Sequence, residues 1–468
     1  MENFIFDLQL FDAPPEIPSG EGGGNYSSSV SWSGATSITS AGTYSSPTYT
    51  STTADENAVL ISTTGTVTLN NATVTKTGGT SASDNYSFYG INSAIMCMGG
   101  GTTSIVGGTV TTDAAGANGI FSYGANNGTT NATGDGTKVY VKNVTINTTA
   151  QGSGGIMTTY GGTTVAENLT ITTSGGSSAP IRTDRGGGWV TVTGGSYTSN
   201  GLGSPAIYST ADVKVNDATL ISNQSEGVCI EGAGSIALSN CTLTANNTNT
   251  NGKATFKDTI MIYQSQSGDA SDGTSSFTMT GGTLNSKNGH VFHVTNTTAT
   301  INLDGVTINN TDSAGILLSV CDDGWSGASN IATLNATNQT LTGDILVGSD
   351  STLNLNLSDS STFTRNISGE IFNAKGTSVS TSIGTVNVTI DEGSTWILTE
   401  DTYITSLTSN GTITTGSFNL YVNNEIYVVE NPDDGDSTLV SGTSGADSIV
   451  NSESNVLESV YKVTNFQK

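Results

Sequence analysis

The seven residues "VKNVTIN" (141–147) decide the fold, because nine other segments of the chain align with them without a gap. Repetition at intervals of roughly 20–50 residues predicts a stack of similar coils rather than one globular core. The ten segments are LNNATVT (69–75), IVGGTVT (105–111), VKNVTIN (141–147), AENLTIT (166–172), VTGGSYT (192–198), VNDATLI (215–221), LSNCTLT (238–244), MTGGTLN (279–285), LDGVTIN (303–309) and ATNQTLT (336–342).

The third position of this repeat contains only Asn, Gly and Asp, the residues that best tolerate a left-handed backbone. We therefore expect a sharp bend between two short strands at each of these positions. The residues of this bend ladder are Asn71, Gly107, Asn143, Asn168, Gly194, Asp217, Asn240, Gly281, Gly305 and Asn338.

Two other positions of the repeat are apolar and predict an inward stack. One is the sixth position, from Val74 to Leu341; between it and the bend lies a Thr or Ser that alternation places outside. The other lies in a separate strand after the bend, at Ile95, Ile120, Ile156, Ile181 and Ile207. The chain is therefore predicted to be all-β, a parallel β-helix (solenoid) with three short strands in each coil.

This pattern resembles the right-handed parallel β-helix of the pectate-lyase type, in which such a bend holds stacked asparagines. Three stretches are more similar still to bacterial secreted or surface β-helix proteins described as adhesin-like. They are "GIMTTYGG" (155–162), "SAPIRTDRGGGWVTVTGGSYTSNGLGSPAIYSTADV" (178–213) and "GSTWILTEDTYITSLTSNGTI" (393–413). The resemblance covers about residues 55–425, and it implies a location outside or on the surface of a bacterial cell.

The spacing of the repeats predicts four segments. Residues 1–54 are an N-terminal segment or cap, 55–344 the main coils, 345–428 shorter C-terminal coils, and 429–468 an acidic linker and tail. In the tail, "ENPDDGDS" (430–437) is typical of a linker. The stretch "SGTSGADSIVNS" (441–452) resembles the start of the calcium-binding repeats of type I secreted proteins.

Composition limits the partners. With 13 Lys and Arg against 39 Asp and Glu, the formal net charge is −26, which disfavours nucleic acid and anionic membrane surfaces. No apolar run reaches the ~18 residues needed to span a membrane. The N-terminus lacks the basic region of a Sec signal peptide.

The four cysteines are far apart and predict small buried core residues with at most one incidental pair, not a metal framework.

The third strand of each coil predicts a candidate binding site. Side chains that flank its inward isoleucines point outward and form an exposed strip of aromatic, Met and Arg residues, unlike the Thr- and Asn-rich surface elsewhere. A large partner, above all a carbohydrate, is the expected ligand, and self-association is also open. The strip comprises Met96, Phe121, Tyr123, Met157, Tyr160, Arg182, Asp184, Arg185 and Tyr208.

Other interpretations of the strip remain open. Long loops such as residues 246–257, or the N-terminal segment, could fold over it, or a second rod could cover it. Arg182 and Arg185 bracket Asp184 and could form a local charge pair. The chain could also be a purely structural rod, or a subunit that assembles end to end through an uncapped coil.

Catalysis is not expected. Lyases that resemble this fold need an Arg or Lys base beside calcium held by several carboxylates, whereas the neighbours of Arg182 in adjacent coils are Met157 and Tyr208. Hydrolases need clustered carboxylates, and no carboxylate can be assigned beside His290 or His293. We therefore expect no enzyme, cofactor or defined metal site, with adventitious calcium at the acidic turns "GDASDG" (268–273) and "CDDGWSG" (321–327).

Regular hydroxyl groups raise an ice-binding alternative. T-x-T pairs such as Thr73/Thr75 and Thr242/Thr244 lie on one flat sheet, but Asn147, Ile221 and Asn285 interrupt the array. Because Thr is a common exposed strand residue, the pairs are explained by strand formation alone.

Overall fold

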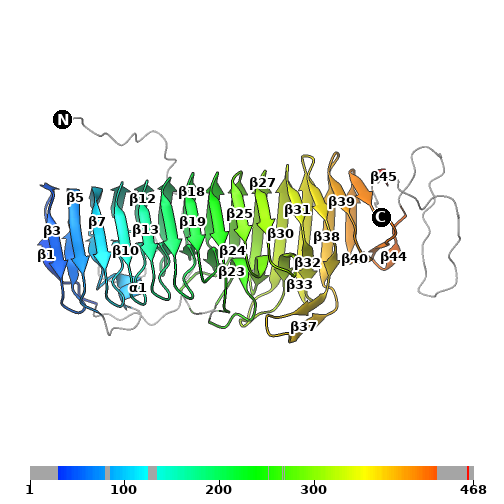
Figure 1. The fold of residues 1–468 in the computed structure, drawn as a ribbon, viewed down its shortest axis with the longest axis horizontal. Coiled ribbons are helices and arrows are strands. Elements are labelled where there is room, and N and C mark those ends of the chain that lie inside the picture. Colours follow the sequence, from blue (N-terminus) through cyan, green and yellow to red (C-terminus); the bar gives the residue numbers. More distant parts are fainter. Residues whose placement is uncertain are drawn as a thin grey trace.

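The computed structural model describes residues 30–79, 85–124, 134–250, 252–265, 267, 269–428 and 461–462. These residues form a rod of stacked coils whose strands run across its long axis (Figure 1). Strands of successive coils pair in parallel, so the predicted all-β parallel β-helix with three strands per coil is confirmed. The described part of the chain has no helix long and apolar enough to cross a membrane.

Thirteen parallel strands, which we call sheet A, form the first side of the rod. They are β1 (Gly34–Ile38), β4 (Asn57–Ser62), β6 (Ile95–Met98), β8 (Ile120–Tyr123), β11 (Ile156–Thr159), β14 (Ile181–Thr183), β17 (Ile207–Ser209), β20 (Val228–Glu231), β23 (Asp258–Tyr263), β26 (His290–Thr295), β29 (Ile316–Val320), β32 (Asp344–Val347) and β35 (Ile367–Ser368).

The second side consists of the strands that precede the bend, which belong to a 22-stranded sheet. They are β2 (Gly42–Ser45), β5 (Thr66–Lys76), β7 (Thr102–Thr112), β9 (Lys138–Lys142), β12 (Gly162–Glu167), β15 (Gly188–Thr193), β18 (Asp212–Asn216), β21 (Ser235–Ser239), β24 (Thr274–Thr280), β27 (Thr298–Asp304), β30 (Asn330–Thr337), β33 (Ser351–Ser358), β38 (Thr385–Ile390) and β41 (Ser406–Ser409).

The third side consists of the strands that follow the bend. They are β3 (Thr48–Ser51), the second halves of β5 and β7, β10 (Thr145–Thr148), β13 (Thr170–Thr173), β16 (Ser196–Ser199), β19 (Thr219–Ser222), β22 (Thr242–Ala245), β25 (Thr283–Ser286), β28 (Thr307–Asn310), β31 (Thr340–Thr342), β34 (Thr362–Thr364), β39 (Thr395–Ile397) and β42 (Thr412–Thr414). The short strand β45 (Tyr461–Lys462) is added to this side beside β42.

All ten residues of the bend ladder have a left-handed backbone, with φ between 48° and 67°. The bends stack directly, since a Cβ atom added to Gly194 would lie 2.3 Å from Oδ1 of Asn168 in the preceding coil. Gly or a residue that tolerates positive φ is therefore required where the chain turns from the second side to the third.

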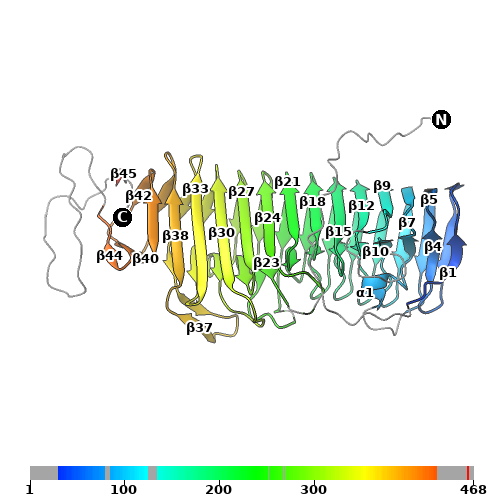
Figure 2. The same cartoon turned by 180° about the vertical axis from the view of Figure 1, so that it is seen from behind.

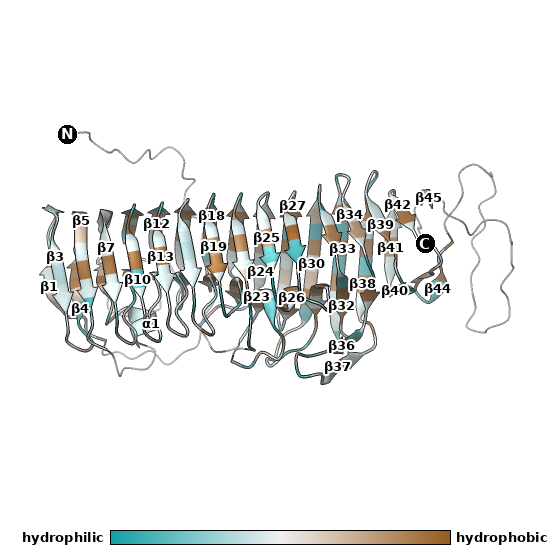
Figure 3. Ribbon diagram, in the orientation of Figure 1, coloured by the Kyte–Doolittle hydropathy of each residue, from teal (hydrophilic) through white to brown (hydrophobic). Residues whose placement is uncertain are grey.

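The core is one continuous stack inside the rod. It extends from Ile38 to Leu420 and includes both apolar columns that the repeat predicts, apart from Ile308, which is half-buried. Figure 3 shows apolar positions recurring along successive strands. Because each inward side chain packs on its equivalents in the neighbouring coils, no coil can bury its own apolar face alone.

The two ends of the stack differ from each other. At the N-terminal end, within the predicted segment or cap 1–54, β1 pairs with β4, and β2 and β3 pair with β5. At the C-terminal end antiparallel pairs appear: β36 (Glu370–Phe372) with β37 (Ser378–Thr381), β43 (Leu420–Val422) with β44 (Glu425–Ile426), and β42 with β45. The linker at 430–437 and the stretch 441–452 lie outside the described residues.

Long connections gather along one edge of the rod. The helix α1 (Asn85–Tyr89) and strand β37 both lie on this edge in the two opposite views (Figures 1 and 2). The segments 246–257 and 264–273 precede and follow β23 of sheet A. Sheet A is therefore the side of the rod on which insertions accumulate.

Candidate functional site

The strand register brings the predicted strip together on the outer surface of sheet A. Met96 pairs with Phe121, Phe121 with Met157, and Met157 with Arg182, so these side chains share one column. Arg182 in turn pairs with Tyr208. The column continues into coils whose register the sequence leaves undecided, with Cys229, Met261 and His293 in succession.

The prediction that the strip is exposed is wrong. Five of its nine residues are completely buried, Asp184 is nearly so, and the other three are half-buried. The completely buried residues are Met96, Phe121, Tyr123, Met157 and Tyr160. The physical reason is that α1 and the residues around it pack on the strip and form a second, smaller core.

We call α1 and the residues around it the cover, and several contacts attach the cover to sheet A. The indole of Trp32 donates to the carbonyl of Tyr89 at 2.7 Å, and the Tyr89 ring stacks on Tyr160 with 5.4 Å between centroids. The hydroxyl of Thr159 donates to the carbonyl of Phe88 at 2.9 Å. The cover thus combines apolar packing with hydrogen bonds that satisfy the end of a short helix.

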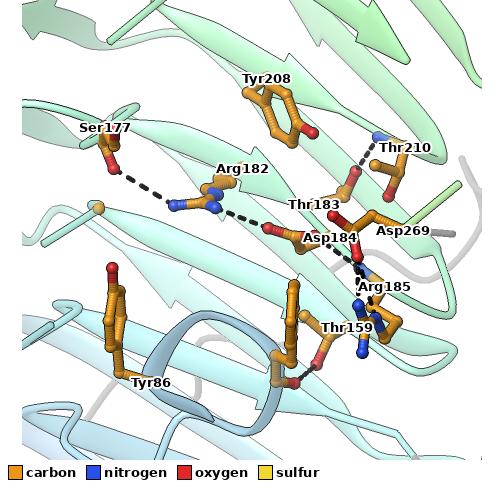
Figure 4. A network of polar contacts seen from close by, with 12 residues as sticks. Tyr86, Thr159, Ser177, Arg182, Thr183, Asp184, Arg185, Tyr208, Thr210 and Asp269 are labelled. Carbon is orange, nitrogen blue, oxygen red and sulfur yellow. Dashed lines mark hydrogen bonds and ion pairs between the residues drawn. The ribbon is translucent and has the colours of Figure 1, made fainter. Parts of the chain in front are cut away.

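Arg182 and Arg185, which flank Asp184 in the sequence, each pair with a carboxylate (Figure 4). Arg182 lies 2.6 Å from Asp184, and Arg185 contacts Asp269 through both Nε and Nη2. Asp184 also accepts the backbone N–H of Arg185 at 2.9 Å. Burial raises the pKa of Asp184 to about 6, although Arg182 opposes the shift.

A second polar network lies beside the first on the same face. The carboxylate of Glu231 accepts hydrogen bonds from Tyr208 at 2.5 Å and from Tyr263 at 2.9 Å. Ser265 and Ser267, in the segment after β23, also donate to it. Burial is the main cause of the raised pKa of both tyrosines, and the negative charge of Glu231 raises both further, so both stay protonated donors.

These contacts give the two arginines a structural role. Each guanidinium has a carboxylate partner, and Asp269 comes from the acidic turn 268–273, so the Arg185 pair fixes that segment against sheet A. Such charge-assisted hydrogen bonds hold a loop in one position. Residue 268 of this turn lies outside the described residues.

A different cluster contains both histidines of the chain. One potential ligand atom from each of Asp258, His290 and His293 lies within 4.8 Å of the others, and all three residues come from β23 and β26. Nε2 of His293 is 3.5 Å from Oδ2 of Asp323, which follows β29. Nδ1 of each imidazole is 2.7 Å from the hydroxyl of Ser319. Three potential metal ligands are therefore gathered around one point, and Asp323 lies beside His293.

Burial and charge shift the titration of these groups. Burial raises the pKa of Asp258 to about 7, against the opposing effect of His293, and lowers the pKa of His290 to about 3. The pKa of His293 is raised, because Asp258 and Asp323 outweigh the effect of its burial. The pKa of Asp323 is lowered despite burial, because it faces His293 and accepts the N–H of Thr255.

Sequence reasoning missed this cluster because it found no carboxylate beside the histidines. Asp258 lies directly opposite His290 in the adjacent coil, 32 residues earlier in the chain. Asp323 belongs to the acidic turn 321–327, for which only adventitious calcium is expected from the sequence. If the pairing register of β23, β26 and β29 could be read from the sequence, it would place Asp258 beside His290.

The four cysteines are all buried free thiols, so the open question of an incidental pair is answered: none is formed. Burial is the largest cause of the raised pKa of each thiol, and it raises the pKa of Cys97 to about 12. They are core residues, as predicted.

Comparison of the chain with protein-family models, curated proteins and solved structures finds no significant match.

Proposed function

We propose that the protein is an adhesin-like rod that acts outside a bacterial cell and holds a large partner, a carbohydrate, along its second side. We call the outward side chains of the strands that precede the bend the open face. This face replaces the strip on sheet A as the proposed binding surface, because α1 and the residues around it cover the part of the strip from Met96 to Tyr160. The resemblance to bacterial adhesin-like β-helices supports the location and the kind of function.

The observation that supports this proposal is the accessibility of the open face. Two adjacent columns run along it in exact register from β5 to β41, and none of their residues is buried. The first column is Thr66, Thr102, Lys138, Thr163, Trp189, Asp212, Ser235, Ser276, Thr300, Thr333, Asn354, Asn387 and Ser406. The second is Thr68, Ser104, Tyr140, Val165, Thr191, Lys214, Ala237, Thr278, Asn302, Asn335, Asn356, Thr389 and Thr408.

Most of the open face is a regular array of hydroxyl and amide groups. Amide side chains of neighbouring coils hydrogen-bond to each other, as in the donation from Asn335 to Asn302 at 2.8 Å and from Asn356 to Asn335 at 2.8 Å. A rigid polar surface of this kind offers many donors and acceptors at a spacing of about 4.8 Å. Repeated hydroxyl groups of a polysaccharide are complementary to such an array.

Two aromatic residues and two lysines of these columns lie within four successive coils, from β9 to β18. Trp189 shares the first column with Lys138, and Tyr140 shares the second with Lys214, over about 14 Å along the rod. An aromatic face, combined with nearby hydrogen-bond donors, is typical of surfaces that hold partners. With a net charge of −26, the chain favours a neutral or cationic partner over a polyanion.

Glycan-array binding by the purified protein tests this function. The key variant is the double substitution Trp189→Ala with Tyr140→Ala, and the matched control is Thr300→Ala with Thr333→Ala in the polar half of the first column. Circular dichroism should show that both variants retain the fold. We expect binding that is lost in the aromatic variant and kept in the control; equal loss in both, or no binding by the wild type, would overturn the proposal.

A purely structural rod is the second candidate, and the unbroken core from Ile38 to Leu420 favours it. Antiparallel pairing of β42 with β45 and of β43 with β44 covers strand edges at the C-terminal end, which opposes end-to-end assembly there. Sedimentation analysis should then show monomers at concentrations where an uncapped solenoid would form filaments.

A further inference from the structure

The cluster around His293 contains a buried carboxylate without a hydrogen-bond partner. The side chain of Asp258 is 1% exposed, and among the described residues neither of its oxygens makes a hydrogen bond. Nε2 of His293 and Oδ2 of Asp323 are likewise buried without one. Burying a carboxylate with no donor costs several kcal/mol, so such groups normally have a compensating cation.

We propose that Asp258, His290 and His293, with Asp323 as a fourth donor, bind a divalent transition-metal ion of the zinc class. The side chains of His293 and Asp323 are 0% exposed, and that of His290 is 12% exposed, so the ion would be enclosed by protein. This site is independent of the open face and of the proposed adhesion.

Charge balance supports a divalent cation at this point. Without metal, two buried carboxylates lie beside two imidazoles in this cluster. A divalent ion with two neutral imidazoles and two carboxylates has no net charge, which removes the electrostatic cost of burial.

The donor atoms favour zinc over calcium or magnesium. Two imidazoles and two carboxylates are a common set for zinc, whereas calcium and magnesium prefer oxygen ligands alone. The 3.5 Å between Nε2 of His293 and Oδ2 of Asp323 is close to the ~3.3 Å that separates two ligands of a tetrahedral zinc with bonds of about 2.0–2.1 Å. Oδ1 of Asp258 is 4.0 Å from Nδ1 of His290, the atom that contacts Ser319, so metal binding would bring Asp258 and His290 closer together.

Groups around the cluster hold these ligands in place. Oδ1 of Asp323 accepts the backbone N–H of Thr255 at 2.6 Å and of Gly324 at 2.8 Å, which leaves Oδ2 toward His293. The hydroxyl of Ser319 contacts both imidazoles, and Phe256 packs on them with ring centroids 5.3 Å and 4.8 Å away. Such surrounding hydrogen bonds orient metal-binding histidines.

The position of the site indicates what the metal does. Asp258, His290 and Ser319 come from three successive coils, and Asp323 from the connection after the third. Through the Thr255 contact, the segment 246–257 is attached to the same point. The ion would therefore fasten two long connections onto sheet A and stabilise the middle of the rod.

Metal binding by the full-length chain tests the site. Protein treated with a chelator and dialysed should bind one equivalent of Zn²⁺ in competition with a chromophoric chelator. With Co²⁺ it should show the intense visible absorption of tetrahedral coordination. Ser319→Ala, which removes the hydroxyl but no ligand, should bind Zn²⁺ ~10–100-fold more weakly.

Two variants separate loss of the site from loss of the fold. Asp258→Asn keeps the shape of the side chain and should abolish stoichiometric Zn²⁺ binding, with an unchanged circular dichroism spectrum. Asp359→Asn, at an exposed bend with positive φ that Asn tolerates, should bind like the wild type. Zn²⁺ should raise the Tm of the wild type and of Asp359→Asn but not of Asp258→Asn. Absence of Zn²⁺ binding by the wild type, or equal binding by folded Asp258→Asn, would overturn the proposal.

Discussion

The guanidinium of Arg185 lies over the ring of Phe88, with its carbon 3.8 Å from the ring centroid. Arg185 follows β14 of sheet A, and Phe88 belongs to α1, so this contact joins the cover to the surface beneath it. The same guanidinium contacts Asp269 in the segment after β23. One side chain thus connects three parts of the chain that are far apart in sequence.

A double-mutant cycle should measure the coupling between Arg185 and Asp269. We expect Arg185→Ala to destabilise the protein by about 2 kcal/mol, because it loses a charge-assisted hydrogen-bond pair and a cation–π contact. Asp269→Ala should cost less, since the contact with Phe88 remains. Urea denaturation of the two single variants and the double variant gives the coupling energy, and additive effects would contradict the pairing.

Removal of the Phe88 ring should expose the covered strip. We expect Phe88→Ala to cost about 3 kcal/mol of stability and to increase binding of the dye ANS, because the aromatic side chains beneath α1 become accessible. Phe418→Ala is the control, since Phe418 is already exposed. Unchanged dye binding in Phe88→Ala would mean that α1 does not shield the strip in solution.

Stability should depend on pH through Asp184. Its pKa in the folded protein, about 6, is above the ordinary carboxyl value of about 3.9, so the folded state binds this proton more tightly than the unfolded chain. The resulting stabilisation is complete below pH ~4 and is lost as pH rises through about 6, by at most about 3 kcal/mol. The urea midpoint should therefore fall more between pH 4 and pH 7 in the wild type than in Asp184→Asn. The same pH dependence in the two proteins would contradict this prediction.

At the bend ladder, substitution by Ala should lower the stability of the protein more than substitution by Gly. Asn168 has φ of 51°, which costs a residue with an ordinary Cβ about 1–2 kcal/mol. Asn168→Ala should lower stability by about that amount, whereas Asn168→Gly should be close to neutral. Thermal denaturation of both variants measures the difference, and an equal loss in both would assign the role of Asn168 to its amide group instead.

The thiols should be unreactive in the folded protein. All four are buried, and the pKa of Cys97 is about 12, so little thiolate forms at pH 8. A chromogenic disulfide reagent should label no thiol under native conditions and four after denaturation. Rapid labelling of any cysteine in the native state would show that its part of the rod opens.

The repeat could be predicted from the sequence because it rests on local backbone preference and alternation. Asn168 must bend wherever its neighbours are strands, and Ile156 must point inward because Gly and polar residues surround it at a fixed spacing. The outward position of Met157 could also be predicted from alternation. Its burial could not, because it depends on α1, whose place above sheet A is not encoded in the strand pattern.

The residue pattern by itself therefore determined the coil, its bends and its inward columns, since each is a short-range property repeated along the chain. Tertiary structure alone decided which outward surface is covered and which stays open. It also decided that Asp258, His290, His293 and Asp323 meet. In β26 both Val291 and Phe292 enter the core, so strict alternation breaks down beside His290. Contacts between coils about thirty residues apart depend on exact register and on loop packing, and these are fixed only when the whole stack has formed.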